Sequence, residues 1–251
     1  EKHYLDGIDL TPEEFFEQLE SAEKLPTTSQ PTPEAFLKEF EAARDAGDEM
    51  VCVLLSSALS GTYQSAAIAR EEADYDGIYL VDSKNVTLAA QLLVRRAVDL
   101  ARSGMSAAEI AEDLEKARER VHLFALVDTL KYLHKGGRLS GAAAIAGGLL
   151  GIKPVISINA EGKLALTDKA RGLPGAYVAI FKQIGKVGGI DERYPVMLGY
   201  TGRRAAVEPF IRYITQNLHL NKPVLRIIGS VVGTHAGPGA CGIAFFSKEE
   251  E

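Results

Sequence analysis

The sequence predicts an α/β protein, and three short apolar runs are the main grounds for this. The runs lie at residues 50–55, 78–81 and 121–127, and segments of helical periodicity separate them. Short apolar runs are typical of strands that are covered on both faces, as in a parallel sheet. Strands that alternate with helices indicate a βαβ architecture. We therefore expect a Rossmann-like first domain built on a parallel sheet.

The composition limits the class of protein. The 251 residues suffice for one large domain or two modest ones, since a typical domain holds ~100–200 residues. A net charge of −6 argues against bulk binding to nucleic acid or to an anionic membrane, and no apolar run approaches the ~18–20 residues of a membrane span. Cys52 and Cys241 are too few for a disulfide framework and suit a reducing cytosol. We expect a cytoplasmic protein without stable membrane insertion.

The first domain is expected over residues 1–130, and capping patterns mark its helices. Thr11-Pro12-Glu13-Glu14 is a capping box with proline at the first helical position. Thr32-Pro33-Glu34 begins a second helix that stops at Gly47. Further helices are expected over 61–72, 87–102 and 106–120, and the last of these opens with a second capping box at Ser106.

The second domain, over residues 131–251, is also expected to be α/β. Residues 154–158 and 163–166 flank the turn sequence Asn159-Ala160-Glu161-Gly162, which indicates a β-hairpin. The remaining expected elements are strands at 195–200, 224–228 and 242–246 and a helix near 205–217.

Three serines, Ser56, Ser57 and Ser60, lie between the first apolar run and the next helix. A hydrolase nucleophile would lie there, but Leu59-Ser60-Gly61-Thr62 is not the G-x-S-x-G pattern of such an elbow. Hydroxyls in this position are also common helix N-caps. A third interpretation is an anion site, because hydroxyls and free N–H groups at a helix N-terminus suit a carboxylate or a phosphate.

His235 lies in a glycine-rich segment, 233–239, which we expect to be a loop from which the ring reaches a cleft. A structural role is the commoner one for a single histidine of this kind. Residues 237–242 fit G-x-G-x-x-G, but the helix and acidic residue of a dinucleotide site do not follow. The other histidines show no metal-ligand spacing. Lys131, Lys135 and Arg138 form a basic cluster that is either a solvated turn or a contact for an anionic ligand or acidic partner.

Six segments, taken in order, resemble the motifs of the DegV family. Four of them resemble its T-S-Q-P loop, its S-S-x-L-S-G-T-Y signature, its second strand end and its L-x-Y-L-x-K-G-G-R element, and two more complete the pattern. Each is weak alone, but the set is specific and covers most of the chain. In this sequence they are Thr28-Ser29-Gln30-Pro31, Ser56-Ser57-Ala58-Leu59-Ser60-Gly61-Thr62-Tyr63, Val81-Asp82-Ser83, Leu130-Lys131-Tyr132-Leu133-His134-Lys135-Gly136-Gly137-Arg138-Leu139, Gly151-Ile152-Lys153-Pro154-Val155-Ile156 and Gly233-Thr234-His235-Ala236-Gly237-Pro238-Gly239.

The resemblance implies a two-domain DegV-like α/β fold with a long-chain fatty acid bound between the domains. Members of the family act as the fatty-acid-binding subunit of bacterial fatty acid kinase, whose partner kinase phosphorylates the carboxylate with ATP. The acyl-phosphate then enters phospholipid synthesis. We therefore expect a subunit that presents substrate and has no catalytic residue, metal or cofactor of its own. The open alternative is a stand-alone serine hydrolase or acyltransferase that uses Ser60 and His235.

The resemblance also assigns roles to residues. Thr28 and Ser60 match hydroxyl donors to the head group, the N–H of Gly61 adds to them, and His235 matches a histidine beside that group. Arg138 matches an arginine implicated in kinase docking or in handling the phosphorylated head. Apolar residues of the second domain are expected to line much of the acyl-chain pocket, and the candidates are Ile145, Leu149, Leu150, Ile243, Phe245 and Phe246.

The chain departs from the family pattern at its start. Family members begin with a strand that ends in Asp-Ser, whereas Tyr4-Leu5-Asp6-Gly7 here already resembles a later segment. We expect that this first strand is missing from the sequence given and not from the folded protein, because its loss would open an edge of the parallel sheet.

Overall fold

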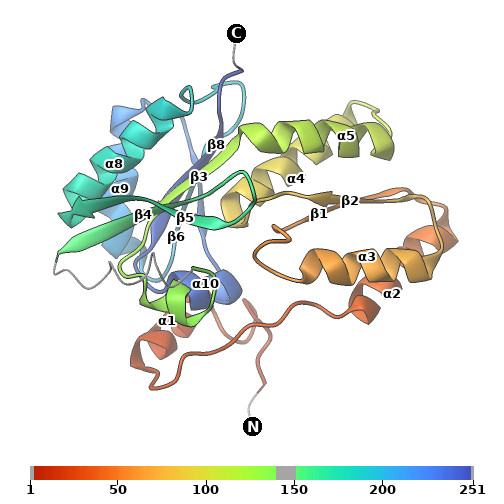
Figure 1. Ribbon diagram of the computed structural model, residues 1–251, viewed down its shortest axis with the longest axis horizontal. Coiled ribbons are helices and arrows are strands. Elements are labelled where there is room, and N and C mark those ends of the chain that lie inside the picture. Colours follow the sequence, from red (N-terminus) through yellow and green to blue (C-terminus); the bar gives the residue numbers. More distant parts are fainter. Residues whose placement is uncertain (1–2, 140–150, 250–251) are drawn as a thin grey trace. The chain divides into compact units, whose positions relative to one another are not determined.

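The computed structural model describes residues 3–139 and 151–249 and divides into two compact units (Figure 1). The larger unit takes in residues 1–28, 122–157 and 164–251, and the smaller unit takes in residues 29–121 and 158–163. Both units combine strands with helices, so the predicted α/β class is confirmed.

The smaller unit is built on two parallel strands. Strand β1 (Met50–Leu54) pairs with β2 (Ile78–Asp82) in a register that sets Met50 opposite Ile78 and Leu54 opposite Asp82. Side chains of the helices fill its core, among them Phe40, Ala66 and Ala69, which are all but inaccessible. The helices are α2 (Pro33–Ala46), α3 (Thr62–Ala73), α4 (Thr87–Arg102) and α5 (Ala107–Ala117), followed by the short 3₁₀ turn η1 (Arg118–Arg120).

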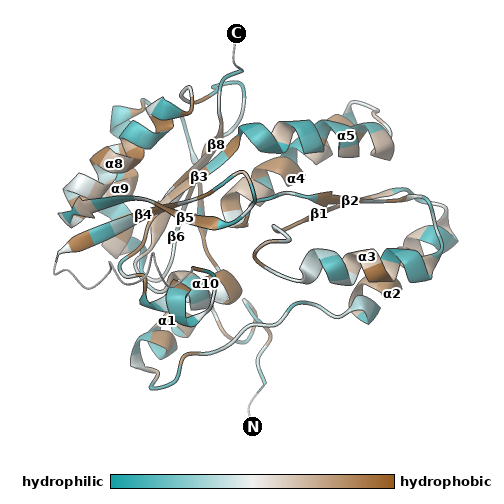
Figure 2. Cartoon of the chain, in the orientation of Figure 1, coloured by the Kyte–Doolittle hydropathy of each residue, from teal (hydrophilic) through white to brown (hydrophobic). Residues whose placement is uncertain are grey.

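The expectation that the first apolar run is covered on both faces is wrong for β1. Only Leu54 of this strand is buried, and the other four residues are partly exposed. The reason is that β1 has a hydrogen-bonded neighbour on one side only within the described residues. An apolar groove of about 590 Å³ runs beside it, and the lining residues include Val51, Val53, Val94, Val98, Met105 and Ile110. Figure 2 shows β1 and β2 in brown beside helices of mixed colour.

The larger unit is built on a mixed sheet of six strands in the order β5-β4-β3-β8-β6-β7. Strand β3 runs antiparallel to β4, and β6 runs antiparallel to β8 and parallel to β7. The strands are β3 (Val121–Leu126), β4 (Ile152–Ile158), β5 (Leu164–Arg171), β6 (Met197–Tyr200), β7 (Val224–Ile227) and β8 (Cys241–Phe246). The helices are α1 (Pro12–Ser21), α6 (Lys131–Lys135), α8 (Gly172–Lys186), α9 (Arg204–Asn217) and α10 (Ser230–Ala236).

The main core of the larger unit lies around β8, whose six residues are all buried. Ile243 and Phe245 pack there with residues of α8 and α9, and Phe124 and Phe245 have ring centroids 6.2 Å apart. The rings of Phe246 and Tyr194 pack at a tilt, with centroids 4.4 Å apart. In this structure Ile243, Phe245 and Phe246 are therefore buried in the packed core of the unit. The other wall candidates, Ile145, Leu149 and Leu150, lie outside the described residues.

The two units divide the chain differently from the expected boundary at residue 130. Residues 11–21 join the larger unit because Phe16 of α1 packs against Gly233 of α10, where an added Cβ would lie 2.4 Å from the ring. Strand β3 joins it because it is hydrogen-bonded to β4. The turn at 158–163 joins the smaller unit, where the buried Ser56 hydroxyl donates to the Gly162 carbonyl at 2.8 Å.

Most predicted elements are confirmed within one to three residues at each end, and β5 extends five residues beyond its expected end, to Arg171. Both capping boxes form, at Thr11 and Ser106, and α2 ends at Gly47 in the left-handed conformation. The hairpin of β4 and β5 turns at Asn159, whose N–H donates to the Lys163 carbonyl. Helices α6, α8 and α10 were not predicted from the sequence, and α10 replaces the loop that was expected around His235.

Candidate functional site

Thr28 and His235 form a hydrogen-bonded pair in the larger unit. His235 lies in the last turn of α10, and Thr28 lies in the extended segment that follows α1. His235 Nε2 and Thr28 Oγ1 are 2.8 Å apart, and both side chains are partly buried. The sequence predicted both residues for one site, and the structure brings them together across 207 positions of the chain.

Gly136 packs against the imidazole ring of His235. A Cβ atom at position 136 would lie 2.1 Å from His235 Nδ1, so the ring occupies the space that a side chain would need. The Nδ1 atom is buried and has no hydrogen-bond partner among the described residues. Close approach of the ring, and not an unusual backbone, is what requires glycine here, because φ at Gly136 is an ordinary −76°.

These surroundings keep the His235 ring neutral. Burial lowers the pKa of His235, and the positive charge of nearby Arg138 lowers this pKa further. A neutral ring carries one N–H, and a buried N–H without a partner is rarer than an unpaired acceptor. We therefore assign the proton to Nε2, which donates to Thr28 Oγ1. The Thr28 hydroxyl then keeps its own proton for a second acceptor.

Arg138 adds a positive charge to this cluster. It follows α6 in the chain, and its Nη1 donates to the carbonyl of Gly136 at 2.7 Å. Lys131 and Lys135, the other members of the predicted basic cluster, are exposed. The guanidinium of Arg138 and the neutral ring of His235 thus share Gly136 as a neighbour, which makes this corner of the larger unit suitable for an anion.

Ser60 and Gly61 lie in the smaller unit, at the start of α3. Gly61 is the N-cap residue of the helix, and Ser60 Oγ accepts a hydrogen bond from the N–H of Thr62 at 3.3 Å. The two hydroxyl oxygens, Ser60 Oγ and Thr62 Oγ1, are 2.9 Å apart. The first hydrogen bond within α3 runs from the Ser65 N–H to the Gly61 carbonyl, so earlier N–H groups point out of the helix end. The polar helix start that the sequence predicted is therefore present.

Gln30 lies at this helix end, although the sequence pattern did not predict it as a site residue. Its Nε2 donates to Ser65 Oγ at 2.9 Å, and a Cβ added at Gly61 would lie 2.0 Å from its Oε1. The side-chain amide of Gln30 therefore lies across the first turn of α3. Its position could have indicated a place in the site, because Gln30 follows Thr28 by two residues in the same four-residue motif.

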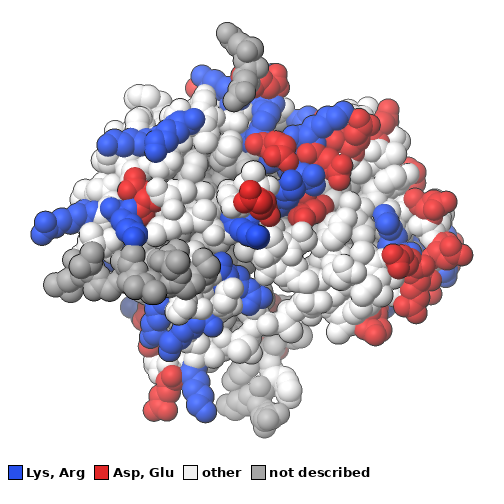
Figure 3. All heavy atoms as spheres, in the orientation of Figure 1, with Lys and Arg blue, Asp and Glu red and all other residues white. Residues whose placement is uncertain are grey.

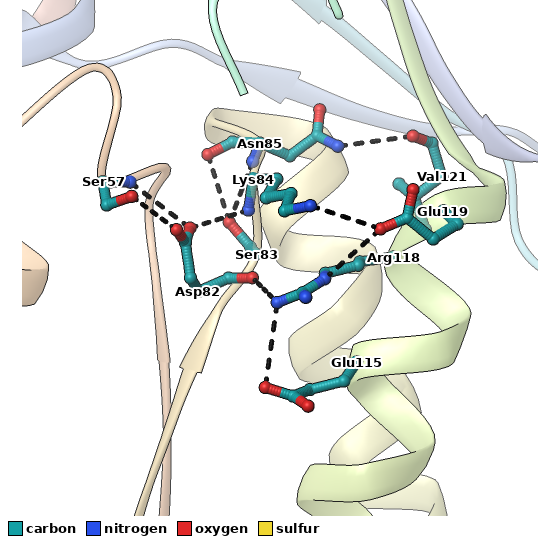
Figure 4. A network of polar contacts seen from close by, with 9 residues as sticks. All are labelled: Ser57, Asp82, Ser83, Lys84, Asn85, Glu115, Arg118, Glu119 and Val121. Atoms are coloured by element: carbon teal, nitrogen blue, oxygen red, sulfur yellow. Dashed lines mark hydrogen bonds and ion pairs between the residues drawn. The ribbon is translucent and has the colours of Figure 1, made fainter. Parts of the chain in front are cut away.

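A network of polar contacts holds the loop that leads to Ser60 (Figure 4). The carboxylate of Asp82, at the end of β2, accepts hydrogen bonds from the Ser57 hydroxyl at 2.6 Å and from the Lys84 N–H at 2.9 Å. The carbonyl of Asp82 accepts a third from Arg118 Nη1 at 2.8 Å. The network ties the loop after β1 to the loop after β2, and so it limits where Ser60 can lie.

The contacts of His235 within its own unit are not those of the base in a serine hydrolase. In such an enzyme the serine is hydrogen-bonded to a histidine base, and a third group orients that base through its other nitrogen. Here Ser60 Oγ contacts Thr62, and His235 Nε2 contacts Thr28. His235 Nδ1 faces Gly136 without a partner among the described residues. Among the described residues, His235 therefore lacks the group that orients the base of a catalytic triad.

Other chemistry finds little support in the described part of the chain. No cluster of three or more His, Cys, Asp or Glu side chains suited to a metal ion occurs in it. Burial raises the pKa of the Cys52 thiol to about 11 and raises that of Cys241 as well, which makes both thiols poor nucleophiles at neutral pH. None of the helices that the structure describes is long and apolar enough to cross a bilayer.

Comparison with known proteins gives matches along almost the whole chain. A family model described as an uncharacterised protein of the DegV family matches residues 1–248. A DegV domain-containing protein of Caldanaerobacter subterraneus is 35% identical over 247 residues, which are 98% of this chain and 88% of that protein.

Two solved structures are similar in fold and in sequence. A structure described as fatty acid binding of a DegV family protein from Thermus thermophilus matches with a TM-score of 0.86 and 31% identity, over 98% of this chain and 87% of that one. A stearic acid-binding protein from Eubacterium ventriosum matches with a TM-score of 0.84 and 27% identity, over 97% and 86% of the two chains.

Proposed function

Because the chain belongs to the DegV family, we propose that it binds a long-chain fatty acid and presents the carboxylate to a separate ATP-dependent fatty acid kinase. The observation that carries the proposal is the Thr28–His235 pair, whose geometry leaves a hydroxyl proton free for an anion. The descriptions of the Thermus and Eubacterium proteins, one fatty acid binding and the other stearic acid-binding, support the choice of ligand.

In this proposal, hydrogen-bond donors of Thr28, Ser60 and Gly61 bind the head group. A carboxylate that leaves water needs replacements for the hydrogen bonds that it loses. The Thr28 hydroxyl has its proton free, and the N–H of Gly61 lies at the positive end of α3. Gln30 links the two sets of donors along the chain, since it follows Thr28 by two residues and contacts Gly61.

His235 and Arg138 are suited to the phosphorylated product. Transfer of a phosphoryl group to the carboxylate raises the negative charge of the head group from one to about two. Arg138 keeps its charge at any physiological pH, and a neutral His235 gains affinity for a proton as negative charge builds up beside it. We propose that both residues stabilise the acyl-phosphate and that neither acts as a nucleophile or as the base of one.

In this proposal, the acyl chain supplies most of the affinity for the fatty acid. At ~0.8 kcal/mol per buried CH₂ group, a C16 chain offers on the order of 10 kcal/mol. A carboxylate that exchanges water for protein donors gains far less in net terms, about 0.5–3 kcal/mol per hydrogen bond. The tail therefore determines how tightly the ligand binds, and the polar residues determine where its carboxylate lies.

Solvent extraction of the purified protein, followed by mass spectrometry, tests ligand binding. We expect long-chain fatty acid in the extract, and its absence from several preparations would contradict the proposal. Thr28→Ala should weaken fatty acid binding by ~1–3 kcal/mol, because a donor to a buried carboxylate is lost. Thr27→Ala is the matched control, since Thr27 is the adjacent threonine and is exposed. Equal losses in the two variants would argue against a role for Thr28.

A coupled assay with a kinase partner tests presentation of the carboxylate. His235→Ala should bind fatty acid more weakly, since Thr28 loses its hydrogen bond to the ring, whereas Arg138→Ala should retain it, and both variants should form acyl-phosphate more slowly at saturating fatty acid. Wild-type rates of acyl-phosphate formation in both variants would exclude the assigned roles. Turnover of a chromogenic ester, abolished by Ser60→Ala, would favour the hydrolase instead.

A further inference from the structure

Helix α10, which carries His235, is too short to keep its shape without its neighbours. It has seven residues, and Gly233 is one of them. Isolated helices shorter than ~12–15 residues are marginal in water, and glycine lowers helix stability further. Helices α1 and α6 pack against α10 (Figure 1). Because His235 lies in the last turn, the contacts that hold the end of α10 also determine where the imidazole ring lies.

The chain leaves α10 through residues 237–240, which we call the exit turn. Gly237 and Gly239 both have a φ of +74°, a conformation that favours glycine. The N–H of Gly237 donates to the carbonyl of Gly233 at 2.8 Å and so closes the helix. Figure 3 shows charged side chains at the surface of the face drawn, but no Asp, Glu, Lys or Arg occurs at positions 227–247. No charged side chain of this segment can therefore anchor the exit turn.

Thr201 is buried against the exit turn. It follows β6 by one residue and is 1% exposed. Its N–H donates to the Ala240 carbonyl at 2.9 Å, and its carbonyl accepts from the Gly239 N–H at 3.3 Å. Its hydroxyl accepts from the Ala240 N–H at 2.8 Å and donates to the Gly237 carbonyl at 2.7 Å, which is nearer than the Ala240 carbonyl at 3.4 Å. Backbone and side chain of Thr201 thus both join it to the exit turn.

The Thr201 hydroxyl takes the place of a carbonyl at the end of the β6–β8 ladder. The register of the two strands, continued by one residue, sets Thr201 opposite Ala240. Opposite residues of an antiparallel pair can exchange N–H···O bonds in both directions. Here the Ala240 N–H turns to the Thr201 hydroxyl, and the Thr201 carbonyl accepts from Gly239 instead. Serine or threonine can accept from Ala240 and donate to Gly237 at once, whereas alanine and valine can do neither.

We propose that Thr201 is a positioning residue, which holds the end of α10 so that the His235 ring meets Thr28. The Gly237 carbonyl that the Thr201 hydroxyl binds lies two residues after His235. His235 Nε2 and Thr28 Oγ1 are 2.8 Å apart, and a hydrogen bond weakens steeply when its distance or angle changes. The expected effect on fatty acid binding rests on the proposed function, but the position of the ring is measurable without any ligand.

A comparison of Thr201→Ala with Thr201→Ser tests the hydroxyl, because these two variants differ by one oxygen atom. In the alanine variant the Ala240 N–H and the Gly237 carbonyl lose their partner. We expect the NMR resonances of the His235 ring to shift in the ligand-free protein, and palmitate affinity to fall about 5- to 30-fold. The serine variant should keep the wild-type ring resonances and affinity. Thr201→Val removes the same hydroxyl at nearly the native side-chain volume, and it replaces Thr201→Ala if that variant does not fold.

Two controls separate this effect from a general loss of stability. Thr167→Ala is the matched variant, since the Thr167 hydroxyl donates to the Val155 carbonyl at 3.1 Å, within the same unit but outside the exit turn. It should leave the His235 resonances and palmitate affinity unchanged. The ring of His122, whose centroid lies 5.7 Å from that of Phe245 in the core, serves as an internal reference. Its resonances should stay fixed in every variant.

Four results would overturn the proposal. They are unmoved His235 resonances in the variants without the hydroxyl, the same shift in Thr201→Ser, the same shift in Thr167→Ala, and a shift of His122 together with His235. Failure of the proposed function gives a different result, namely a wild-type protein that binds no palmitate. A His235 ring that moves in Thr201→Ala and not in Thr201→Ser would still support the positioning role in that case.

Discussion

A methyl group added at position 136 should displace His235 and weaken fatty acid binding. In Gly136→Ala the new Cβ would lie 2.1 Å from His235 Nδ1, whereas ordinary contacts begin at 3.4 Å. The ring must therefore retreat by at least 1.3 Å, which is 3.4 less 2.1. A movement of that size is incompatible with the 2.8 Å hydrogen bond between His235 Nε2 and Thr28 Oγ1. The Thr28 hydroxyl then loses the donor that orients it.

The expected magnitude follows from the two interactions that are disturbed. Loss of the oriented Thr28 donor should weaken fatty acid binding by ~1–3 kcal/mol, or about 5- to 150-fold. Overpacking of the ring should lower the free energy of unfolding by a further ~1–3 kcal/mol. No backbone strain adds to this cost, because φ at Gly136 is −76°, a value that alanine adopts readily.

Gly137→Ala is the control, because the adjacent glycine differs in physical role. Its φ is +72°, and nothing lies within 4 Å of an added Cβ. The substitution should cost ~1–2 kcal/mol of stability through backbone strain and leave ligand affinity unchanged. Calorimetric titration with palmitate measures the affinity, and the NMR resonance of the His235 ring reports its displacement. Wild-type affinity and an unmoved resonance in Gly136→Ala would refute the reasoning.

Three further predictions concern stability and reactivity. Burial lowers the pKa of His235 and of His122 in the folded state, so the unfolded chain binds more protons below pH ~6.5. The free energy of unfolding should therefore fall as the pH drops below that value. His235→Gln and His122→Gln should each flatten this slope, and equal slopes in the wild type and both variants would contradict the prediction. Asp82→Asn should lower the free energy of unfolding by ~1–3 kcal/mol in a urea titration, since the Ser57 hydroxyl and other donors lose a charged acceptor, and an unchanged midpoint would argue against the network. Cys52, with its pKa raised to about 11, should resist iodoacetamide at pH 7.5, so rapid alkylation there would show that the thiol is more accessible than the structure has it.

Local chemistry predicted where helices begin better than where the domains divide. Thr11 and Ser106 cap their helices as expected because a capping box depends only on residues within one turn. The division at residue 130 depended on long-range packing, such as that of Phe16 against Gly233, which no local pattern reports. The expectation that strand β1 is covered on both faces was wrong, because apolar residues alone do not show how many neighbours a strand has.

Glycine content concealed the helix that carries His235. Each glycine in a helix costs about 1 kcal/mol relative to alanine, so the sequence of a segment with Gly233 and Gly237 predicts a loop. Tertiary contacts override that preference, because Gly233 of α10 admits the ring of Phe16 at a distance that no side chain at 233 would allow. The same contact keeps α10 against α1, and so it places His235 next to the segment that contains Thr28. The structure brings His235 to Thr28, with which the sequence grouped it, but the helix that carries it was not predicted.

Four of the six motifs that resemble those of the family contact one another in pairs, and this explains why the motifs are informative together. Gln30 of the first motif lies against Gly61 of the second, at 2.0 Å from where a Cβ would be. Gly136 of the lysine-glycine-glycine-arginine element admits His235 of the last motif, and Gly237 of that motif admits Tyr132 in return, 2.3 Å from an added Cβ. In each of these pairs, the side chain of one motif occupies the space that a Cβ atom would need in the other, so that the second motif requires a glycine there. A chain that kept one member of a pair and lost the other would place a methyl group in a ring or leave a void, so the motifs are informative as a set and weak singly.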